Sequence, residues 1–282
     1  MSHNQIQSVI LNQANNSAAN ANQMTLNFPF PYASTGEQIA LANLFINYSW
    51  FNITSAYGNN TCAYIFNGTS YPVTFTNGFY QASDISGYIQ NVMFNNGHYL
   101  VDNNGNTIYY LSLVANYVYY GITLTCTPLP TSLPTGWTNP HGITLSGYTP
   151  SLVVNNSAFG KLIGYNNLTT PATYTTTVQY QKNSDFTPQI SPVTTINVAC
   201  NMVNSAKFNT FGNVIYSFSP NVTFGSQIQV NPPNYIWFGI VEGQYSQMQI
   251  SFMDQNYNPL QINDTNITLT LMIRKNQNYG VK

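Results

Sequence analysis

Apolar residues recur at every second position along much of this 282-residue chain, and this alternation constrains its fold more than any other feature. It is clearest after Pro192, where such runs return at about ten-residue intervals with turn residues between them. A period of two places alternate side chains on one face of a β-strand. The pattern predicts an all-β protein, built as an antiparallel sandwich or barrel.

Two segments predict hairpins. From Ile250 to Lys275, two alternating runs flank a polar stretch with Asp254 and Pro259, residues that favour chain reversal, so we expect a hairpin with one buried face. Near residue 65 two shorter runs meet at Asn67-Gly68, a dipeptide that tolerates the positive φ of a tight turn. The second hairpin is the stronger local signal.

A single helix with one apolar face interrupts the strands. Its spacing of i, i+3, i+4 and i+7 predicts a helix over residues 84–94 lying outside the sheets, with Ser83 or Asp84 as its N-cap. A compact turn or a short helix is also expected around residues 158–164. The apolar face of the first helix consists of Ile85, Tyr88, Ile89 and Val92.

Composition changes along the chain suggest its domain boundaries. Residues 1–21 are rich in Asn, Gln, Ala and Ser and predict a flexible N-terminal arm. Residues 22–275 form the folded body. The proline-rich stretch 128–150 indicates an irregular connection or the start of an inserted subdomain at about 128–185, because proline interrupts sheet pairing. Residues 276–282 are expected to be a C-terminal tail.

Charge is scarce in this sequence. Charged residues make up 5% of the chain, against roughly 25% in ordinary globular proteins, whereas aromatic residues reach 15%. An uncharged, tyrosine-rich surface is suited to burial against neighbouring molecules, because no charge is desolvated there. The alternative is a free protein whose source simply uses Asn and Tyr heavily. The net charge of −1 gives no field to attract a nucleic acid to the folded body, and no apolar run reaches the roughly 20 residues of a membrane-spanning helix.

Residues that carry chemistry in other proteins are scattered here. His3, His98 and His141 have no metal-ligand spacing, so no metal or cofactor is expected. The three cysteines are far apart in sequence and are expected to be buried free thiols. They are Cys62, Cys126 and Cys200.

The aspartates also have structural explanations. Asp84 fits a helix cap, whereas Asp102, Asp254 and Asp264 lie in turn sequences where a short acceptor side chain is useful. A pair of these carboxylates is the alternative, as acid and base of a glycan hydrolase. No Gly-x-Ser-x-Gly elbow or phosphate-binding loop occurs in the chain. We therefore predict that the protein is not an enzyme and has no catalytic residue.

Two further groups of residues have competing interpretations. The tyrosines of residues 108–121 are suited to stacking on bases or sugars, but they alternate in predicted strands without interleaved Lys or Arg, which favours core and interface packing. Arg274, Lys275 and Lys282, with Tyr279 among them, are read as a basic cluster on a solvated tail, with contact to an anionic partner as the alternative.

The alternation also predicts which side chains fill the core. Register is hard to read where Tyr and Phe occupy both parities, so some of these assignments are expected to fall on the wrong face. The predicted core consists of Phe45, Tyr64, Ile65, Val73, Phe75, Ile85, Ile89, Leu111, Leu113, Ile122, Leu124, Val198, Ile215, Phe218, Ile228, Trp237, Ile250, Phe252, Leu269 and Leu271.

The order of several segments resembles a known family. "FPFPY", "IALANLFINYSWFNI", "GFYQASDISGYIQ", "FGKLIGY", "SPVTTINVACNMV", "NVIYSFSPNVTFGSQIQVNPPNYIWFGI" and "ISFMDQNYNPLQINDTNITLTLMIRK" together resemble the penton, or minor, capsid proteins of polinton-like viruses, adintoviruses and virophages. The likeness covers roughly residues 24–275. It implies a jelly-roll β-sandwich that assembles as a pentamer at icosahedral fivefold vertices, and it implies no catalytic residues. The proline-rich segment 128–150 has no fixed counterpart in that pattern.

The resemblance and the composition lead to one functional hypothesis. We expect a structural capsid protein of the virion, a homopentameric penton that contacts the major capsid protein and other minor capsid proteins. The alternative from a different class is a receptor-binding or glycan-binding spike or fibre head, and a glycan hydrolase is a distant third. We also expect the arm, residues 1–21, to be ordered only in the assembly, with the apolar residues of positions 6–11 packing on a neighbouring subunit.

Overall fold

The computed structural model of the chain describes residues 6–16, 22–173, 178–204 and 213–276. The chain divides into two units, which we call the sandwich (Met1–Trp50 with Val193–Lys282) and the insert (Phe51–Pro192). Strands dominate the described residues, and the predicted all-β jelly-roll class is confirmed. The division differs from the expected one, because the inserted unit begins at Phe51 rather than near residue 128. The strands between residues 61 and 126 therefore lie outside the sandwich.

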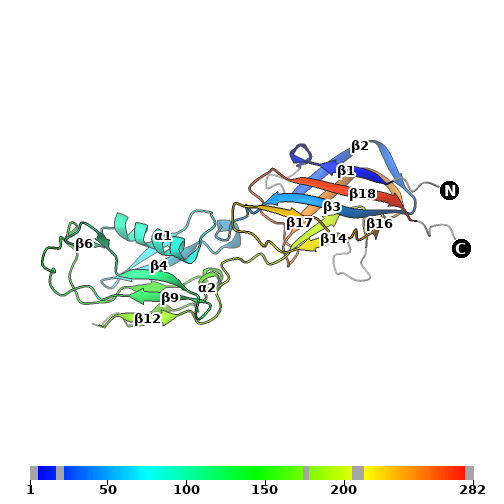
Figure 1. The fold of residues 1–282 in the computed structure, drawn as a ribbon. Coiled ribbons are helices and arrows are strands. Elements are labelled where there is room, and N and C mark those ends of the chain that lie inside the picture. Colours follow the sequence, from blue (N-terminus) through cyan, green and yellow to red (C-terminus); the bar gives the residue numbers. More distant parts are fainter. Residues whose placement is uncertain (1–5, 17–21, 174–177, 205–212, 277–282) are drawn as a thin grey trace. The chain divides into compact units, whose positions relative to one another are not determined.

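The sandwich consists of two antiparallel sheets, visible as two layers in Figure 1. Each sheet joins strands from both ends of the sequence. One has the order β1 (Gln7–Leu11), β18 (Thr268–Lys275), β3 (Glu37–Asn47), β15 (Gln227–Val230), and β16 (Phe238–Gly239) also pairs with β3. The other has the order β14 (Val214–Phe218), β13 (Ile196–Cys200), β17 (Gly243–Met253), β2 (Gln23–Ser34).

The predicted hairpin at the C-terminal end is wrong. β17 and β18 both exist and both bury alternate residues, but they belong to different sheets and do not pair with each other. Phe252 of β17 and Leu271 of β18 are fully buried. The segment between the strands thus crosses from one sheet to the other, and both apolar faces supply the core of the sandwich. Period two defines the buried face of a strand but not its pairing partner.

A β-bulge explains why Phe45 is only partly buried. The β3–β18 register pairs Asn43 with Thr270 and Leu41 with Leu271, so Ala42 is an extra residue on β3. An extra residue reverses the parity of the buried face. Before the bulge Ile39 and Leu41 are buried, and after it Leu44 and Ile46 are, which turns the Phe45 side chain away from the core.

The predicted core is otherwise largely confirmed. Its members divide between the sandwich and the insert, and every one is buried except Phe45, Ile65, Phe218 and Trp237, which are half-buried. Ile65 alternates with Tyr64 and Phe66 in β4 (Thr61–Phe66) and lies on the opposite face of that strand. Full burial of an aliphatic or aromatic side chain contributes roughly 1.5–3 kcal/mol, so each of the fully buried residues stabilises its unit appreciably.

The insert combines small antiparallel sheets with two helices (Figure 1). Its hydrophobic core lies between these elements and includes buried residues of helix α1 (Ala82–Asn95) and of the two larger sheets described next. The sheets have the orders β11 (Thr169–Thr170), β10 (Ser151–Val153), β4 (Thr61–Phe66), β5 (Thr69–Thr74); β12 (Tyr180–Asn183), β9 (Gly121–Cys126), β8 (Leu111–Asn116); and β6 (Leu100–Val101), β7 (Thr107–Ile108). The helices are α1 (Ala82–Asn95) and α2 (Ser157–Ile163).

Local signals in the insert are accurate. β4 and β5 pair through the turn at Asn67 (φ 47°) and Gly68 (φ 80°), so the tight hairpin is confirmed. Helix α1 spans the predicted 84–94, but it begins earlier and its N-cap is Gln81. Asp84 is instead the third helical residue, whose carboxylate accepts a hydrogen bond from the Gln81 N–H at 2.9 Å. It thus completes a capping box rather than forming the cap itself.

The proline-rich segment 128–150 contains no strand or helix of its own in the structure. It covers part of the insert core, where Leu129 is buried and Trp137, Ile143 and Leu145 pack against the buried cluster. Its one ladder contact is an isolated bridge between Thr138 and Val101.

Both chain ends differ from the expected free segments within the residues that the structure describes. Gln7–Leu11 of the expected arm forms strand β1, which pairs with β18 and buries Leu11 completely. Asn12 caps a short 3₁₀ turn, and Asn16 donates to the carbonyl of Thr265 at 3.0 Å. Residues 1–5 and 17–21 lie outside the described residues, as does the expected tail except Asn276, whose N–H donates to the Gly36 carbonyl.

Candidate assembly surfaces

The residues considered for catalysis have structural roles. Asp102 accepts hydrogen bonds from the backbone N–H groups of Asn104 and Asn106, and Asp254 accepts from those of Asn256 and Asn258. These contacts hold turns, as predicted. The hydrogen bonds of Asn106 hold the pKa of Asp102 below its ordinary value. A depressed pKa suits an ionised acceptor and is the opposite of what a general acid needs.

Asp264 is likewise an acceptor. Its carboxylate bonds the Asn266 N–H at 2.8 Å and the Asn47 side-chain amide at 2.6 Å, and these donors lower its pKa. No three His, Cys, Asp or Glu side chains of the described residues gather closely enough to hold a metal ion. No helix in the described part of the chain has the length and apolar character needed to cross a membrane.

The three cysteines are buried free thiols, as predicted. Burial raises the pKa of Cys126 to about 12 and that of Cys200 to about 11, and it raises the pKa of Cys62 further. At neutral pH these groups are protonated, and a protonated buried thiol is unreactive. They behave as small apolar side chains within the two cores.

His98 is enclosed by aromatic rings in the insert. Its ring stacks on Phe66 with centroids 4.3 Å apart, and the edge of Tyr71 approaches at 4.4 Å. Asn96 donates to the Tyr64 hydroxyl, which leaves the Tyr64 proton for His98 Nδ1 at 2.9 Å. Burial lowers the pKa of His98 below its ordinary value. This neutral, fully packed imidazole holds the end of α1 and has no metal-ligand geometry.

The basic residues near the C-terminus are not on a free tail. Arg274 lies in β18, with its guanidinium 4.0 Å from the centre of the Trp237 ring and its Nε donating to Gln38. Lys275 Nζ lies 2.7 Å from a carboxylate oxygen of Glu37. Both cations thus have partners within the sheet, and the prediction that they lie on a tail is wrong, although the Lys275 side chain stays exposed to solvent. Tyr279 and Lys282 lie outside the described residues.

The tyrosines of residues 108–121 divide into two sets. Tyr110 is buried in the insert, as the packing interpretation predicted. Tyr117–Tyr120, by contrast, is the turn between β8 and β9 and not a strand, and we call it the tyrosine tip. The exposed fractions of its side chains are 89% for Tyr117, 89% for Val118, 69% for Tyr119 and 77% for Tyr120. The expectation of core packing is therefore wrong for this turn.

Sequence patterns gave little indication of the tyrosine tip. Turns are usually formed by Gly, Asn, Asp, Pro or Ser, and "NYVYYG" contains such residues only at its ends. The available signal was the pair Asn116 and Gly121, which bracket the turn. An apolar patch of this exposure in a folded protein indicates an interaction surface.

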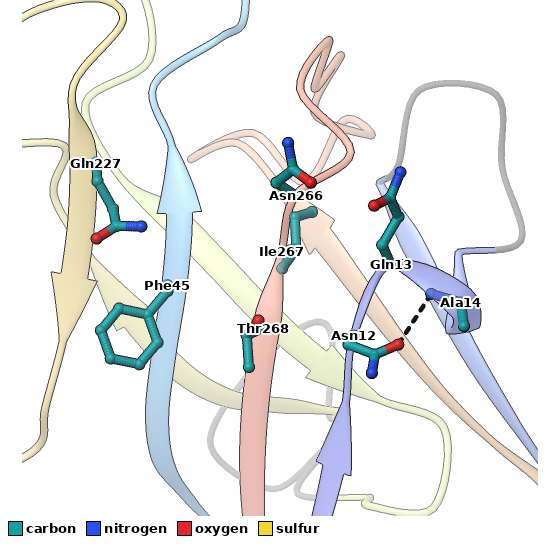
Figure 2. A pocket seen from close by; sticks show the side chains of 8 residues that line it. All are labelled: Asn12, Gln13, Ala14, Phe45, Gln227, Asn266, Ile267 and Thr268. Carbon is teal, nitrogen blue, oxygen red and sulfur yellow. Dashed lines mark hydrogen bonds between the residues drawn. The ribbon is translucent and has the colours of Figure 1, made fainter.

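A second surface is an open groove of about 510 Å³ on the sandwich. Figure 2 shows the Phe45 ring between Gln227 of β15 and Thr268 of β18, with Asn12 beyond Thr268. The bulge in β3 places Phe45 there. We call this surface the amide groove, because side-chain amides dominate its lining and none of its lining residues is charged. It is lined by Asn12, Gln13, Ala14, Phe45, Gln227, Asn266, Ile267 and Thr268.

No protein-family model and no curated protein matches this chain. The fold is similar to the mavirus penton protein in its crystal structure, with a TM-score of 0.45 and 10% identity, over 96% of this chain and 98% of that one. It is also similar to a chain in the 3.5 Å cryo-EM structure of the Sputnik virophage, with a TM-score of 0.41 and 14% identity over the same shares of the two chains.

Proposed function

We propose that this chain is a structural capsid protein of a virus and that it forms the homopentameric penton at the fivefold vertices of an icosahedral particle. It works in the virion, and its partners are other copies of itself, the major capsid protein and other minor capsid proteins. The observation that carries the proposal is a folded all-β chain with 5% charged residues that exposes an aromatic turn to solvent.

The physical argument concerns the surface. A free globular protein keeps its surface hydrated with charged groups, whereas this chain relies on amides and hydroxyls. Two of its few cations, Lys182 and Lys275, already pair with Asp185 and Glu37 at 2.8 and 2.7 Å. Such a surface loses little hydration energy when neighbours cover it. It therefore suits a shell in which each subunit is covered by others.

The sequence resemblance supports the proposed position at the fivefold vertices. It extends over roughly residues 24–275 and thus includes strands of the sandwich and of the insert. The roles of Asp102, Asp254 and Asp264 as turn acceptors favour the structural interpretation of these carboxylates over the glycan hydrolase. Loss of turnover on mutating Asp254 or Asp264 in a folded protein would revive that alternative.

The proposal is tested by microscopy. Purified full-length protein should form fivefold rings in negative stain, and an antibody against it should label the vertices of purified particles. Labelling of the flat faces of the particle, or a purified protein that stays monomeric at high concentration, would contradict the penton assignment.

A receptor-binding or glycan-binding head is the second candidate, and the amide groove favours it. Aromatic rings stack on sugars and side-chain amides bond sugar hydroxyls, and the groove offers Phe45 beside Gln227, with Asn12 beyond Thr268. Selective binding of one oligosaccharide on a glycan array by a monomer or trimer, lost in Phe45→Ser, would support this candidate over the penton.

A further inference from the structure

Hydrogen bonds hold the base of the tyrosine tip. Asn116 accepts a hydrogen bond from the Tyr119 N–H at 3.4 Å and donates its amide to Thr123 Oγ1 at 2.9 Å. Thr123 in turn donates to Asn183 of the neighbouring strand β12 at 2.7 Å. These bonds link the base of the turn to two strands, so the exposed rings project from an ordered support. Pre-organisation of this kind reduces the ordering cost of binding.

The side chains of the tip are exposed and are not part of the hydrophobic core of the insert. Tyr120 also takes a positive φ of 50°, which Gly or Asn adopts at lower cost. Four exposed side chains, three of them aromatic, are therefore explained by what covers them and not by the insert itself.

The lack of charge around the tip limits which kind of surface can bind it. From Asn103 to Gly160 the sequence contains no Asp, Glu, Lys or Arg. On the adjacent strand Lys182 is neutralised by Asp185 at 2.8 Å. An uncharged tip fits a partner surface that is also uncharged, because any unpaired partner charge would be desolvated at a cost. Among protein surfaces, another copy of this nearly uncharged chain meets that condition.

The amide groove of the sandwich has complementary chemistry. Phe45 offers a ring for aromatic stacking, and the amides of Asn12 and Gln227 can bond tyrosine hydroxyls. Asp264, two residues before Asn266 of the lining, is already bonded by Asn47. We infer that the tyrosine tip of one copy docks in the amide groove of a second copy, a contact that builds the oligomer.

The area of the contact is adequate for this role. Three tyrosines bury up to about 150–250 Å² each, and a stable interface buries about 800 Å² per partner. The tip would thus supply a large share of one interface. Because each copy carries one tip and one groove, the contact is head-to-tail and closes a ring when the rotation between copies fits. The inference rests on the proposed homo-oligomer and names its contact residues.

Cross-linking between two separately labelled chains tests the contact. We would mix full-length Val118→Cys with full-length Gln227→Cys, both at exposed positions, and oxidise the mixture. A covalent dimer should form, and the three native cysteines should not interfere because they are buried. The matched control pairs Val118→Cys with Gln244→Cys, an exposed residue of β17 in the other sheet, and should give no dimer above background.

Two substitutions give an independent measurement. Val118→Ser with Tyr119→Ser should weaken self-association at least about tenfold by native mass spectrometry, and Gln227→Ala should weaken it less. All three positions are exposed, so circular dichroism should confirm unchanged folding. Equal self-association of wild type and the double variant, or a dimer in the control mixture as strong as in the test mixture, would overturn the inference.

The outcomes separate this contact from the proposed function. Fivefold rings that persist in the double variant, without the specific cross-link, would refute the tip contact and leave the penton intact. A specific cross-link in an oligomer that is not fivefold would support the contact and refute the penton. Binding of the tip to zwitterionic lipid vesicles or to a glycan, with no change in self-association on mutation, would assign the tip to another partner.

Discussion

The insert and the sandwich are both β-rich, but they differ in how far apart in the sequence their paired strands lie. The insert is one continuous stretch, Phe51–Pro192, and its main ladders join strands close in sequence, such as β4 with β5 and β8 with β9. The sandwich joins the two ends of the chain, because β3 pairs with β18 across more than two hundred residues. Long-range pairing must overcome a larger loop-closure entropy before its contacts stabilise the fold.

This difference in strand pairing indicates which unit is stabilised by contacts within one continuous segment. The insert has its own hydrophobic cluster and needs no residue outside its range to complete its sheets. The sandwich is complete only when β1, β2 and β3 meet strands that follow Val193. We therefore expect two cooperative units whose stabilities change separately, and the following experiments examine this expectation from the largest effect to the smallest.

The largest effect should come from truncating a fully buried aromatic residue in either core. Phe252→Ala in the sandwich and Phe159→Ala in the insert, where Phe159 stacks on Phe75 at 5.3 Å, should each cost about 3–5 kcal/mol. Urea unfolding followed by hydrogen exchange of separate peptides should show each loss in one unit only. Equal destabilisation of both units by either variant would show a single cooperative structure.

The next effect concerns strand β1. Leu11→Ala should lower the stability of the sandwich by about 2–4 kcal/mol, because Leu11 is fully buried opposite Leu269. Ile10→Ala is the matched control on the opposite face of the strand, with 62% of the side chain exposed, and should cost less than about 1 kcal/mol. Deletion of residues 2–20 should therefore destabilise the sandwich, contrary to the sequence-based expectation of an arm that is ordered only in the assembly, and an unchanged urea midpoint would restore that expectation.

A smaller effect is expected at the end of α2. Gly164 has a φ of 81°, and an added Cβ would collide with the Phe186 carbonyl oxygen, so Gly164→Ala combines an unfavourable backbone conformation with a clash. Gly105 has a φ of 82° and open space around it. Gly105→Ala should cost about 1 kcal/mol and Gly164→Ala about 2–3 kcal/mol. The thermal unfolding midpoints of the two variants check this. Similar midpoints would mean that the backbone around Phe186 moves to accommodate the added Cβ.

The smallest effect separates the units by pH. Burial lowers the pKa of His98, so the unfolded chain, where imidazole has its usual pKa of about 6.5, binds a proton at higher pH than the native insert does. The stability of the insert should therefore fall as the pH drops below about 6.5. The described residues of the sandwich contain no histidine, and the lowered pKa values of Glu37 and Asp264 affect it only at more acidic pH.

The control is His98→Asn, whose side-chain oxygen can accept the Tyr64 hydrogen bond without titrating in this range. Hydrogen exchange of insert peptides between pH 6.5 and 5 should show a pH-dependent loss of protection in the wild type and a flat response in the variant. The same slope in both proteins would assign the pH dependence to another group.

The tyrosine tip shows why a surface is harder to predict than a strand. In "IYYLSLVANYVYYG" the same residue types occupy buried and exposed positions, because Tyr110 packs in the core while Tyr117 and Tyr119 project from a turn. Tyrosine carries both apolar area and a hydroxyl, so its burial depends on its position relative to the turn. Asn116 and Gly121 mark that turn. The four residues between them are Tyr and Val, which favour strands, so the sequence pattern indicates a strand there.

The amide groove depends on two further features that no local pattern contains. Phe45 faces it only because the extra residue Ala42 shifts the parity of β3. Asn12 reaches it only because β1 pairs with β18, which brings residues more than two hundred positions apart to one edge. Both features result from the ladder that forms in the folded chain.

The sequence by itself determined the all-β class, the Asn67-Gly68 hairpin, the helix at 84–94, the acceptor roles of the turn aspartates and the near absence of charge. Each follows from periodicity, turn chemistry or composition, which act within a few residues or over the whole chain. Only the tertiary structure decided the division at Phe51 and Pro192, the placement of β17 and β18 in different sheets, and the exposure of the tyrosine tip. These depend on which strand lies beside which, and strands of the same alternation pair equally well until packing and loop closure distinguish them.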